Sequence, residues 1–191
     1  MGKIMYLYNK TGFFAVGLEG ISKPRNAGAI FRTAHAFNSD FVFTVNSKID
    51  IKSIYATDTS KTFKSVPYYN YETPQEISVP KNCAIVGVEL CDESVVLPEF
   101  CHPIRCAYIF GPERGNLSQE MQEKCDYMVK IPTKFCINVS TAVAITIYDR
   151  IQSLHKWSRR PLTPRGKPER NKLHTSGGPV IRRGNNKGYD F

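Results

Sequence analysis

The sequence contains no apolar run approaching the roughly 20 residues that a membrane-spanning helix needs, and its longest apolar stretches have the length of strands. Its N-terminus has neither an uninterrupted apolar segment nor a small-residue cleavage site, which disfavours a secretory leader. Tyr6 stands where N-myristoylation requires Ser or Thr. We therefore expect a soluble, cytoplasmic protein that does not bind a membrane.

The six cysteines, at positions 83, 91, 101, 106, 125 and 136, include no C-x-x-C pair. His102 follows Cys101 but lacks partners at the spacing of a zinc site. Several cysteines lie within apolar stretches, where a free thiol behaves as a small core residue. The spacing thus favours reduced structural thiols over a disulfide framework or a metal centre, and we expect no metal. We also find no internal repeat.

The 191 residues suit one domain with an extension, and the hydrophobic fraction of 41% can support a core. Residues 1–155 hold 16 Lys and Arg against 15 Asp and Glu, whereas residues 156–191 hold ten against two. Most of the net charge of +9 therefore belongs to the C-terminal end. We divide the chain into a domain of residues 1–157 and a basic tail of residues 158–191, expected to be disordered or to fold only on a partner.

The patterning predicts an α/β fold, with a mainly parallel sheet flanked by helices. A strand at 13–19, an amphipathic helix at 27–37 and a strand at 41–45 form a β-α-β unit, which implies parallel pairing. Asn26 is the expected cap of that helix. The segment 46–67 is ambiguous, with a possible helix near 53–63. The other expected strands are at 68–71, 84–90, 106–110 and 127–131, with a short extended piece at 93–97. The other expected helices are one from Thr73, one from Ser118, which we expect to be an N-cap, and one over 142–154.

Three polar clusters stand at strand-to-helix junctions: Asn26 with Arg32, the loop G-P-E-R-G-N with Glu113, and Cys136–Ser140 with Asn138. In a parallel sheet such junctions all lie at the carboxyl ends of the strands, so we expect the three clusters to share one site. Each cluster also has a simpler explanation. Arg32 can be a solvated helix charge, Asn138 a helix cap and Glu113 a turn residue.

In this order, the three clusters resemble the motifs of the SpoU/TrmH branch of the SPOUT RNA methyltransferases. N-A-G-A-I-F-R-T-A is similar to the first motif, N-x-G-x-x-x-R-x-A. I-F-G-P-E-R-G-N-L, followed by V-K-I-P-T, is similar to the second motif, and C-I-N-V-S-T-A to the third, usually S-L-N-V-S-x-A. The resemblance spans roughly residues 12–157, and the tail has no counterpart in these motifs.

The resemblance implies a deep trefoil knot in the C-terminal half of the domain and a homodimer. It also implies transfer of a methyl group from S-adenosylmethionine to a ribose 2′-hydroxyl of tRNA or rRNA. The residues matching the catalytic positions are Arg32, Asn26, Glu113 and Asn138. Those matching cofactor-binding positions are Val88, Glu89, Leu90, Gly111, Pro112, Gly115, Ile131, Cys136, Asn138 and Ser140. Cys136 replaces the usual Ser, and a thiol is a weaker hydrogen-bonding group than a hydroxyl.

Arg32 matches the family's candidate base, yet a guanidinium normally stays protonated. We therefore favour a role in positioning the RNA phosphate and offsetting charge on the 2′-oxygen, with literal proton removal as the alternative. RNA binding is expected from Arg25, Arg32, Arg114, Lys156, Arg159 and Arg160. The alternative for the basic tail is a solubilising segment, or one that binds anionic surfaces nonspecifically. The alternative functions are a noncatalytic RNA-binding or ribosome-assembly factor that keeps the fold, and a base methyltransferase.

Overall fold

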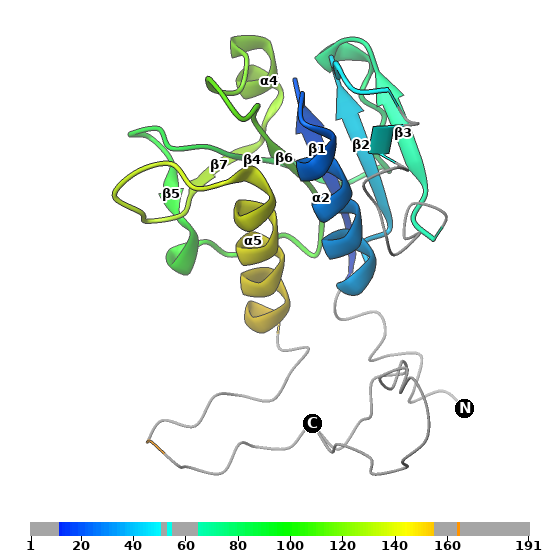
Figure 1. Ribbon diagram of the computed structural model, residues 1–191. Helices are drawn as coiled ribbons and strands as arrows, with labels where there is room; N and C mark the ends of the chain where they lie inside the picture. Colours follow the sequence, from blue (N-terminus) through cyan, green and yellow to red (C-terminus); the bar gives the residue numbers. More distant parts are fainter. Residues whose placement is uncertain (1–11, 51–52, 55–64, 155–163, 165–191) are drawn as a thin grey trace, which may run out of the picture. The chain divides into compact units, whose positions relative to one another are not determined.

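The computed structural model describes residues 12–50, 53–54, 65–154 and 164 (Figure 1). The chain divides into two compact units, residues 1–156 and 157–191, and every helix and strand described here belongs to the first. The strands are β1 (Phe13–Glu19), β2 (Phe41–Val45), β3 (Tyr68–Tyr71), β4 (Ala84–Val88), β5 (Val95–Val96), β6 (Arg105–Phe110) and β7 (Tyr127–Lys130). The helices are α2 (Pro24–Ala36), α4 (Gln119–Lys124) and α5 (Val139–Ser153), with short 3-10 turns η3 (Pro74–Glu76) and η4 (Leu97–Glu99).

The strands form one seven-stranded sheet in the order β3-β2-β1-β6-β4-β7-β5, and every pairing is parallel. The predicted α/β class with a parallel sheet is therefore confirmed. The trefoil knot stays a prediction from the family resemblance. Among the described residues, no helix combines the length and the apolar character that crossing a membrane requires.

The strand order reverses direction beside β1. The chain builds outward from β1 through β2 to β3, and then crosses to β4 on the other side. β6 fills the place between β1 and β4 and pairs with both. Ligands of open α/β sheets bind at the carboxyl ends of the strands where the order reverses, because the loops there diverge and leave a crevice. The topology thus directs attention to the loops that follow β1 and β6.

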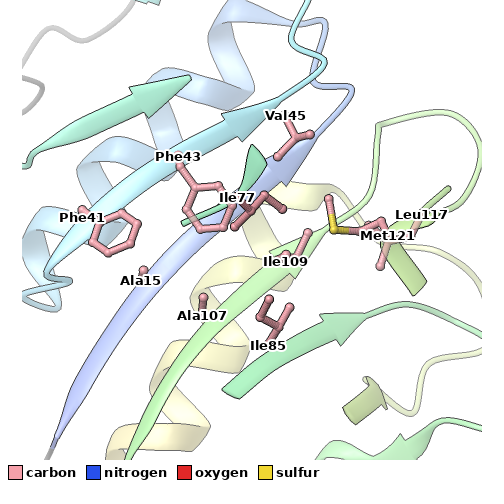
Figure 2. Packing of buried hydrophobic residues seen from close by; sticks show 10 residues of the cluster. All are labelled: Ala15, Phe41, Phe43, Val45, Ile77, Ile85, Ala107, Ile109, Leu117 and Met121. Carbon is pink, nitrogen blue, oxygen red and sulfur yellow. The ribbon is translucent and has the colours of Figure 1, made fainter. Parts of the chain in front are cut away.

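Alternate residues of the central strands face two different layers. Tyr108 and Cys106 contact Arg150 of α5, and α2 packs beside α5 on this face (Figure 1). The opposite face carries a buried cluster that η3, α4 and their flanking loops cover (Figure 2). This cluster consists of Ala15, Phe41, Phe43, Val45, Ile77, Ile85, Ala107, Ile109, Leu117 and Met121. Both faces of the sheet are buried, which explains the nearly continuous apolar strands in the sequence.

Most predicted elements are found, and the main differences concern where they begin and end. The first helix begins at Pro24 rather than at residue 27, because Pro fits the first helical turn, and Lys23 rather than Asn26 is its N-cap. The helix expected from Thr73 is only the turn η3. The last helix begins at Val139, since Asn138 caps it by accepting a hydrogen bond from the backbone of Ser140.

The predicted Ser118 cap of α4 is present and accepts a hydrogen bond from the backbone N–H of Met121 (3.1 Å). Strand β4 ends at Val88, two residues before its predicted end. The helix expected near 53–63 lies mostly outside the described residues, and so does the basic tail apart from Pro164.

Candidate active site

The loop after β6 is joined to the start of α2 through one carboxylate. Glu113 accepts hydrogen bonds from the backbone N–H groups of Ser22 and Lys23 (both 3.1 Å), from the Ser22 hydroxyl (3.0 Å) and from the Asn26 side-chain amide (3.0 Å). Partial burial acts to raise the pKa of Glu113, but hydrogen bonds from Asn26 and Ser22 outweigh it and lower that pKa. Such a carboxylate stays ionised and is poorly suited to accept a proton at neutral pH.

Two further carboxylates hold the same loop from other strands. Glu19 ends β1, is buried, and accepts hydrogen bonds from the backbone N–H (2.8 Å) and the hydroxyl (2.5 Å) of Ser118. Glu89 follows β4 and accepts a hydrogen bond from the backbone N–H of Leu117 (3.0 Å). Residues 111–118 are therefore tied to the ends of β1 and β4 as well as to α2.

The third predicted cluster joins this network through a pair of side-chain amides. The Asn138 amide donates to the Asn26 side-chain oxygen (3.1 Å). The Asn138 oxygen in turn accepts from the backbone N–H (2.9 Å) and hydroxyl (2.6 Å) of Ser140. Asn26 is buried and uses both ends of its amide, donating to Glu113 and accepting from Asn138. The structure thus brings the three polar clusters of the sequence into one hydrogen-bonded network.

Arg32 lies outside this network. It is exposed on α2, six residues after Asn26, and a helix turns about 100° per residue, so the two side chains project from different sides. Arg25, seven residues earlier, shares the side of Arg32 and is also exposed. Within the described part of the chain, the Arg32 guanidinium has no hydrogen bond or ion pair. It is available to an anionic group from outside the chain.

Several residues predicted to bind the cofactor gather at the ends of three adjacent strands. Val88 ends β4, Gly111 follows β6 and Ile131 follows β7, and β4 pairs with both of the other strands. A Cβ on Gly111 would lie 3.1 Å from a carboxylate oxygen of Glu89 and 3.1 Å from the backbone nitrogen of Leu117. A side chain at this position would be in tight contact with both groups, so Glu89 or the loop would have to shift to admit it.

The remaining predicted cofactor residues lie around the same loops. Gly115 has a φ of +98°, in the left-handed region that favours glycine, so the turn that carries Glu113 requires it. Pro112 is half-buried beside it, and Leu90 and Cys136 are exposed. The Cys136 thiol has no hydrogen bond with the described residues, as expected for a weak donor in place of a hydroxyl.

The RNA-binding predictions divide between described and undescribed residues. Arg114, like Arg25 and Arg32, is exposed on the described surface. Lys156, Arg159 and Arg160 lie outside the described residues. Among residues 12–50, 53–54 and 65–154, no group of three His, Cys, Asp or Glu side chains is arranged to bind a metal ion.

The carboxylate of Glu19 was not predicted from the sequence, and Glu89 was predicted only as a cofactor-binding residue, without a role for its side chain in holding the loop. Each carboxylate stands at the end of an otherwise apolar strand, and this was the available signal. A buried or half-buried acid at such a position needs donors. The identity of those donors, 28 residues away for Glu89 and 99 for Glu19, is not written in local sequence.

Comparison with known proteins gives a consistent result. The model of the SpoU rRNA Methylase family matches residues 14–148. The tRNA (guanosine(18)-2′-O)-methyltransferase of Borreliella burgdorferi is 27% identical over 154 residues, covering 78% of this chain and 71% of its own length. The 23S rRNA (guanosine-2′-O-)-methyltransferase RlmB of Blochmanniella floridana is 26% identical over 144 residues, covering 71% of this chain. The chain spans only 56% of that relative's length.

A solved structure supports the fold. The AdoMet-bound rRNA methyltransferase of Sinorhizobium meliloti superposes with a TM-score of 0.67, at 21% identity, over 73% of this chain and 56% of its own. This likeness supports the fold, and the match of the family model over residues 14–148 identifies the family.

Proposed function

Because this chain belongs to the SpoU rRNA methylase family, we propose that it transfers a methyl group from S-adenosylmethionine to a ribose 2′-hydroxyl of tRNA or rRNA. One observation carries the proposal. The three loops that hold the family-like motifs are joined side chain to side chain, through Asn26, Glu113 and Asn138, at the switch point of the sheet. The order of the three motifs in the sequence does not by itself require these side chains to form hydrogen bonds with one another.

The proposed cofactor site lies at the carboxyl ends of the adjacent strands β6, β4 and β7. The residues that would hold S-adenosylmethionine are the backbone of Val88–Leu90, Gly111 and Ile131, with Cys136 and Ser140 from the third loop. Gly111 has no side chain of its own, so a ligand can come close to the main chain at the end of β6. S-adenosylmethionine, when bound, supplies a methyl group already activated on a sulfonium. The Sinorhizobium meliloti rRNA methyltransferase of similar fold contains AdoMet, which supports this assignment.

A sugar hydroxyl is a weak nucleophile at neutral pH, so the site must stabilise charge that develops on the 2′-oxygen. We assign this task to Arg32, together with binding of the adjacent RNA phosphate. Its guanidinium is exposed and unpaired among the described residues, and a guanidinium offers a charged fork of donors suited to phosphate. Glu113 is engaged by four donors, so it orders the loops around the site rather than taking the proton.

A second copy of the chain is part of the proposal. Helix α5 exposes Ile145 (38%) and Tyr148 (41%), and the loop before it exposes Phe135 (76%). Ile145 and Tyr148 are three residues apart and so lie on one side of α5, and exposed apolar side chains grouped in this way favour an interface. This agrees with the homodimer that the motif resemblance implies.

The test is methylation of unfractionated tRNA and total rRNA with S-adenosylmethionine, followed by a ribose-methylation map of the products. We expect one or a few new 2′-O-methyl positions. Binding of RNA without binding of S-adenosylmethionine in calorimetry would instead show a noncatalytic RNA-binding factor. A methyl group on a base would contradict the assigned reaction.

The same assay tests Arg32. Arg32→Lys keeps the charge but removes the planar fork, and we expect kcat to fall about 10- to 100-fold, corresponding to ~1.4–3 kcal/mol of transition-state stabilisation. The matched control is Arg105→Lys, an exposed arginine at the other end of the sheet. Methylation by Arg32→Lys at the wild-type rate would show that a point charge is sufficient there.

A further inference from the structure

A polar cavity of about 480 Å³ opens beside the network, at the carboxyl ends of β1 and β2. Its walls come from three loops: the one that leads into α2, the one that follows β2, and the one that follows β6. The residues that matter for its chemistry are Lys23, Asn46, Lys48, Arg114, Glu19 and Glu113. We name this cavity the basic cleft. It lies toward β2, whereas the proposed cofactor residues lie toward β4 and β7.

Three cations reach the basic cleft from separate parts of the sequence. Lys23, Lys48 and Arg114 are all exposed, and each comes from a different loop. Among the described residues, the only ion pair joins His102 and Asp149, so none of these three cations has a carboxylate partner there. Unpaired cations grouped around one cavity indicate an anionic ligand.

The two acids in the wall are already used by other groups. Both oxygens of Glu19 accept hydrogen bonds from Ser118, and both oxygens of Glu113 accept from the start of α2. Their fixed donors satisfy these carboxylates and hold them in the wall. The lysines and the arginine are therefore left for a ligand that enters from solvent.

The backbone holds Lys48 over the cleft. Asn46 has a φ of +48°, a left-handed conformation that turns the chain sharply as it leaves β2. The Asn46 N–H donates to the carbonyl of Tyr71 (3.0 Å), and the Lys48 N–H donates to the carbonyl of Ile21 (3.2 Å). These bonds tie the loop after β2 to the edge strand and to the first loop. A preorganised cation loses less freedom on binding than one on a mobile loop.

We propose that the basic cleft binds the phosphate–ribose backbone of the substrate RNA beside the nucleotide that is methylated. This proposal rests on the proposed function, because it names the part of that substrate that the cleft contacts. The cleft offers point charges and amides without an aromatic platform, which suits backbone contact rather than base recognition. Lys23 lines the cleft and is also the N-cap of α2. The cleft therefore lies at the start of the helix that exposes Arg25 and Arg32.

The test compares RNA affinity across salt concentrations for Lys48→Ala, Lys23→Ala and Arg114→Ala, with unfractionated tRNA and total rRNA as probes. Loss of one phosphate contact reduces the slope of log affinity against log salt by roughly 0.7–0.9. We expect each variant to show that reduction and to bind RNA several-fold more weakly, with its affinity for S-adenosylmethionine unchanged. Lys48→Arg should retain the wild-type slope.

Lys81→Ala is the matched control, because Lys81 is an exposed lysine just before β4, at the opposite end of the sheet. It should leave the slope unchanged. Wild-type slopes in the three cleft variants, with methylation intact, would overturn the cleft and leave the methyltransferase assignment standing. Reduced slopes in a protein that methylates no RNA would support the cleft as a site for RNA and overturn the reaction.

Discussion

The two ends of the sheet carry polar networks of opposite design. At the carboxyl ends of the strands, the carboxylates of Glu19, Glu89 and Glu113 accept hydrogen bonds from loop residues. The cations of the basic cleft nearby are exposed. At the amino ends, one buried cation, Arg150, donates to loop and strand carbonyls. The first arrangement fixes loop positions while leaving charge available to a ligand. At the amino ends, the charge of Arg150 interacts with groups of the protein itself and is not available to a ligand.

Arg150 lies on α5 and is 1% exposed. Its guanidinium donates to the carbonyls of Pro103, Ile104 (2.8 Å) and Phe13 (3.4 Å), which joins the helix to the starts of β1 and β6. It also lies over the rings of Phe14 (5.4 Å) and Tyr108 (5.9 Å). Carbonyls and aromatic faces thus solvate the charge in place of water. We conclude that this end of the sheet contributes stability rather than chemistry.

The largest expected effect is therefore on stability. Arg150→Ala removes the donors of several buried carbonyls and leaves a cavity, and we expect a loss of about 3–5 kcal/mol in the free energy of unfolding. Urea denaturation measures this change. Arg105→Ala, an exposed arginine at the same end, should alter stability by less than about 0.5 kcal/mol. A small effect of Arg150→Ala would remove the distinction between the two ends.

The second prediction addresses the other end. Glu113→Gln preserves shape but removes the charge and replaces one acceptor oxygen by a donor, which conflicts with the backbone N–H groups of Ser22 and Lys23. We expect methylation to fall about 10- to 100-fold, equivalent to ~1.4–2.8 kcal/mol, with a smaller loss of stability. Glu93→Gln, an exposed acid, is the control. Equal losses of folding and activity would show that Glu113 only stabilises the fold.

The smallest expected effect is a pH dependence at the amino end. The buried His102 ring shares hydrogen bonds with Tyr108 and with Asp149 (2.9 Å). Burial lowers the pKa of His102 below its usual 6.5, although Asp149 acts in the opposite direction. The unfolded chain therefore binds a proton before the folded one as pH falls, and stability is present above about pH 6.5 and is lost below it.

Urea denaturation at steps between pH 5.5 and 7.5 measures this dependence. His102→Gln should flatten the profile in that window, although it destabilises the protein at every pH. His35→Gln, at an exposed histidine, should leave the profile as it is in the wild type. An unchanged profile in His102→Gln would assign the pH dependence to other groups.

Patterns in the local sequence correctly predicted the features that depend only on neighbouring residues, such as strands and helix caps. The apolar strands at 13–19 and 41–45 and the Ser118 cap are found as expected, since period and capping are local properties. The loop around Glu113 was identified because Pro fixes its own φ and Gly permits backbone conformations that other residues avoid, so the two together mark a turn. The motif order then identified the family, which no single loop could do.

Partners distant in sequence were not predictable in the same way. Asn26 was predicted as a site residue from its motif, but the partners of its amide, Glu113 and Asn138, lie 87 and 112 residues away and were not predicted. Arg150 was not singled out, because a charged residue in an otherwise ordinary helix gives no sign that it is buried. The basic cleft was also missed, since its three cations meet only after the loops have come together.

The place of β6 in the sheet has a consequence for how the chain folds. β6 pairs with β1, about 90 positions earlier in the chain, and with β4, so the centre of the sheet closes only when residues 105–110 are in place. Contacts between such distant segments carry a large loop-closure cost and slow folding. A nascent chain that ends before β6 would leave one side of β1 and both sides of β4 unpaired, and such strands recruit strands from other molecules. During synthesis, β6 is therefore the strand that carries the Glu113 loop of the candidate site and also the strand that covers these unpaired sides, which protects the protein from aggregation.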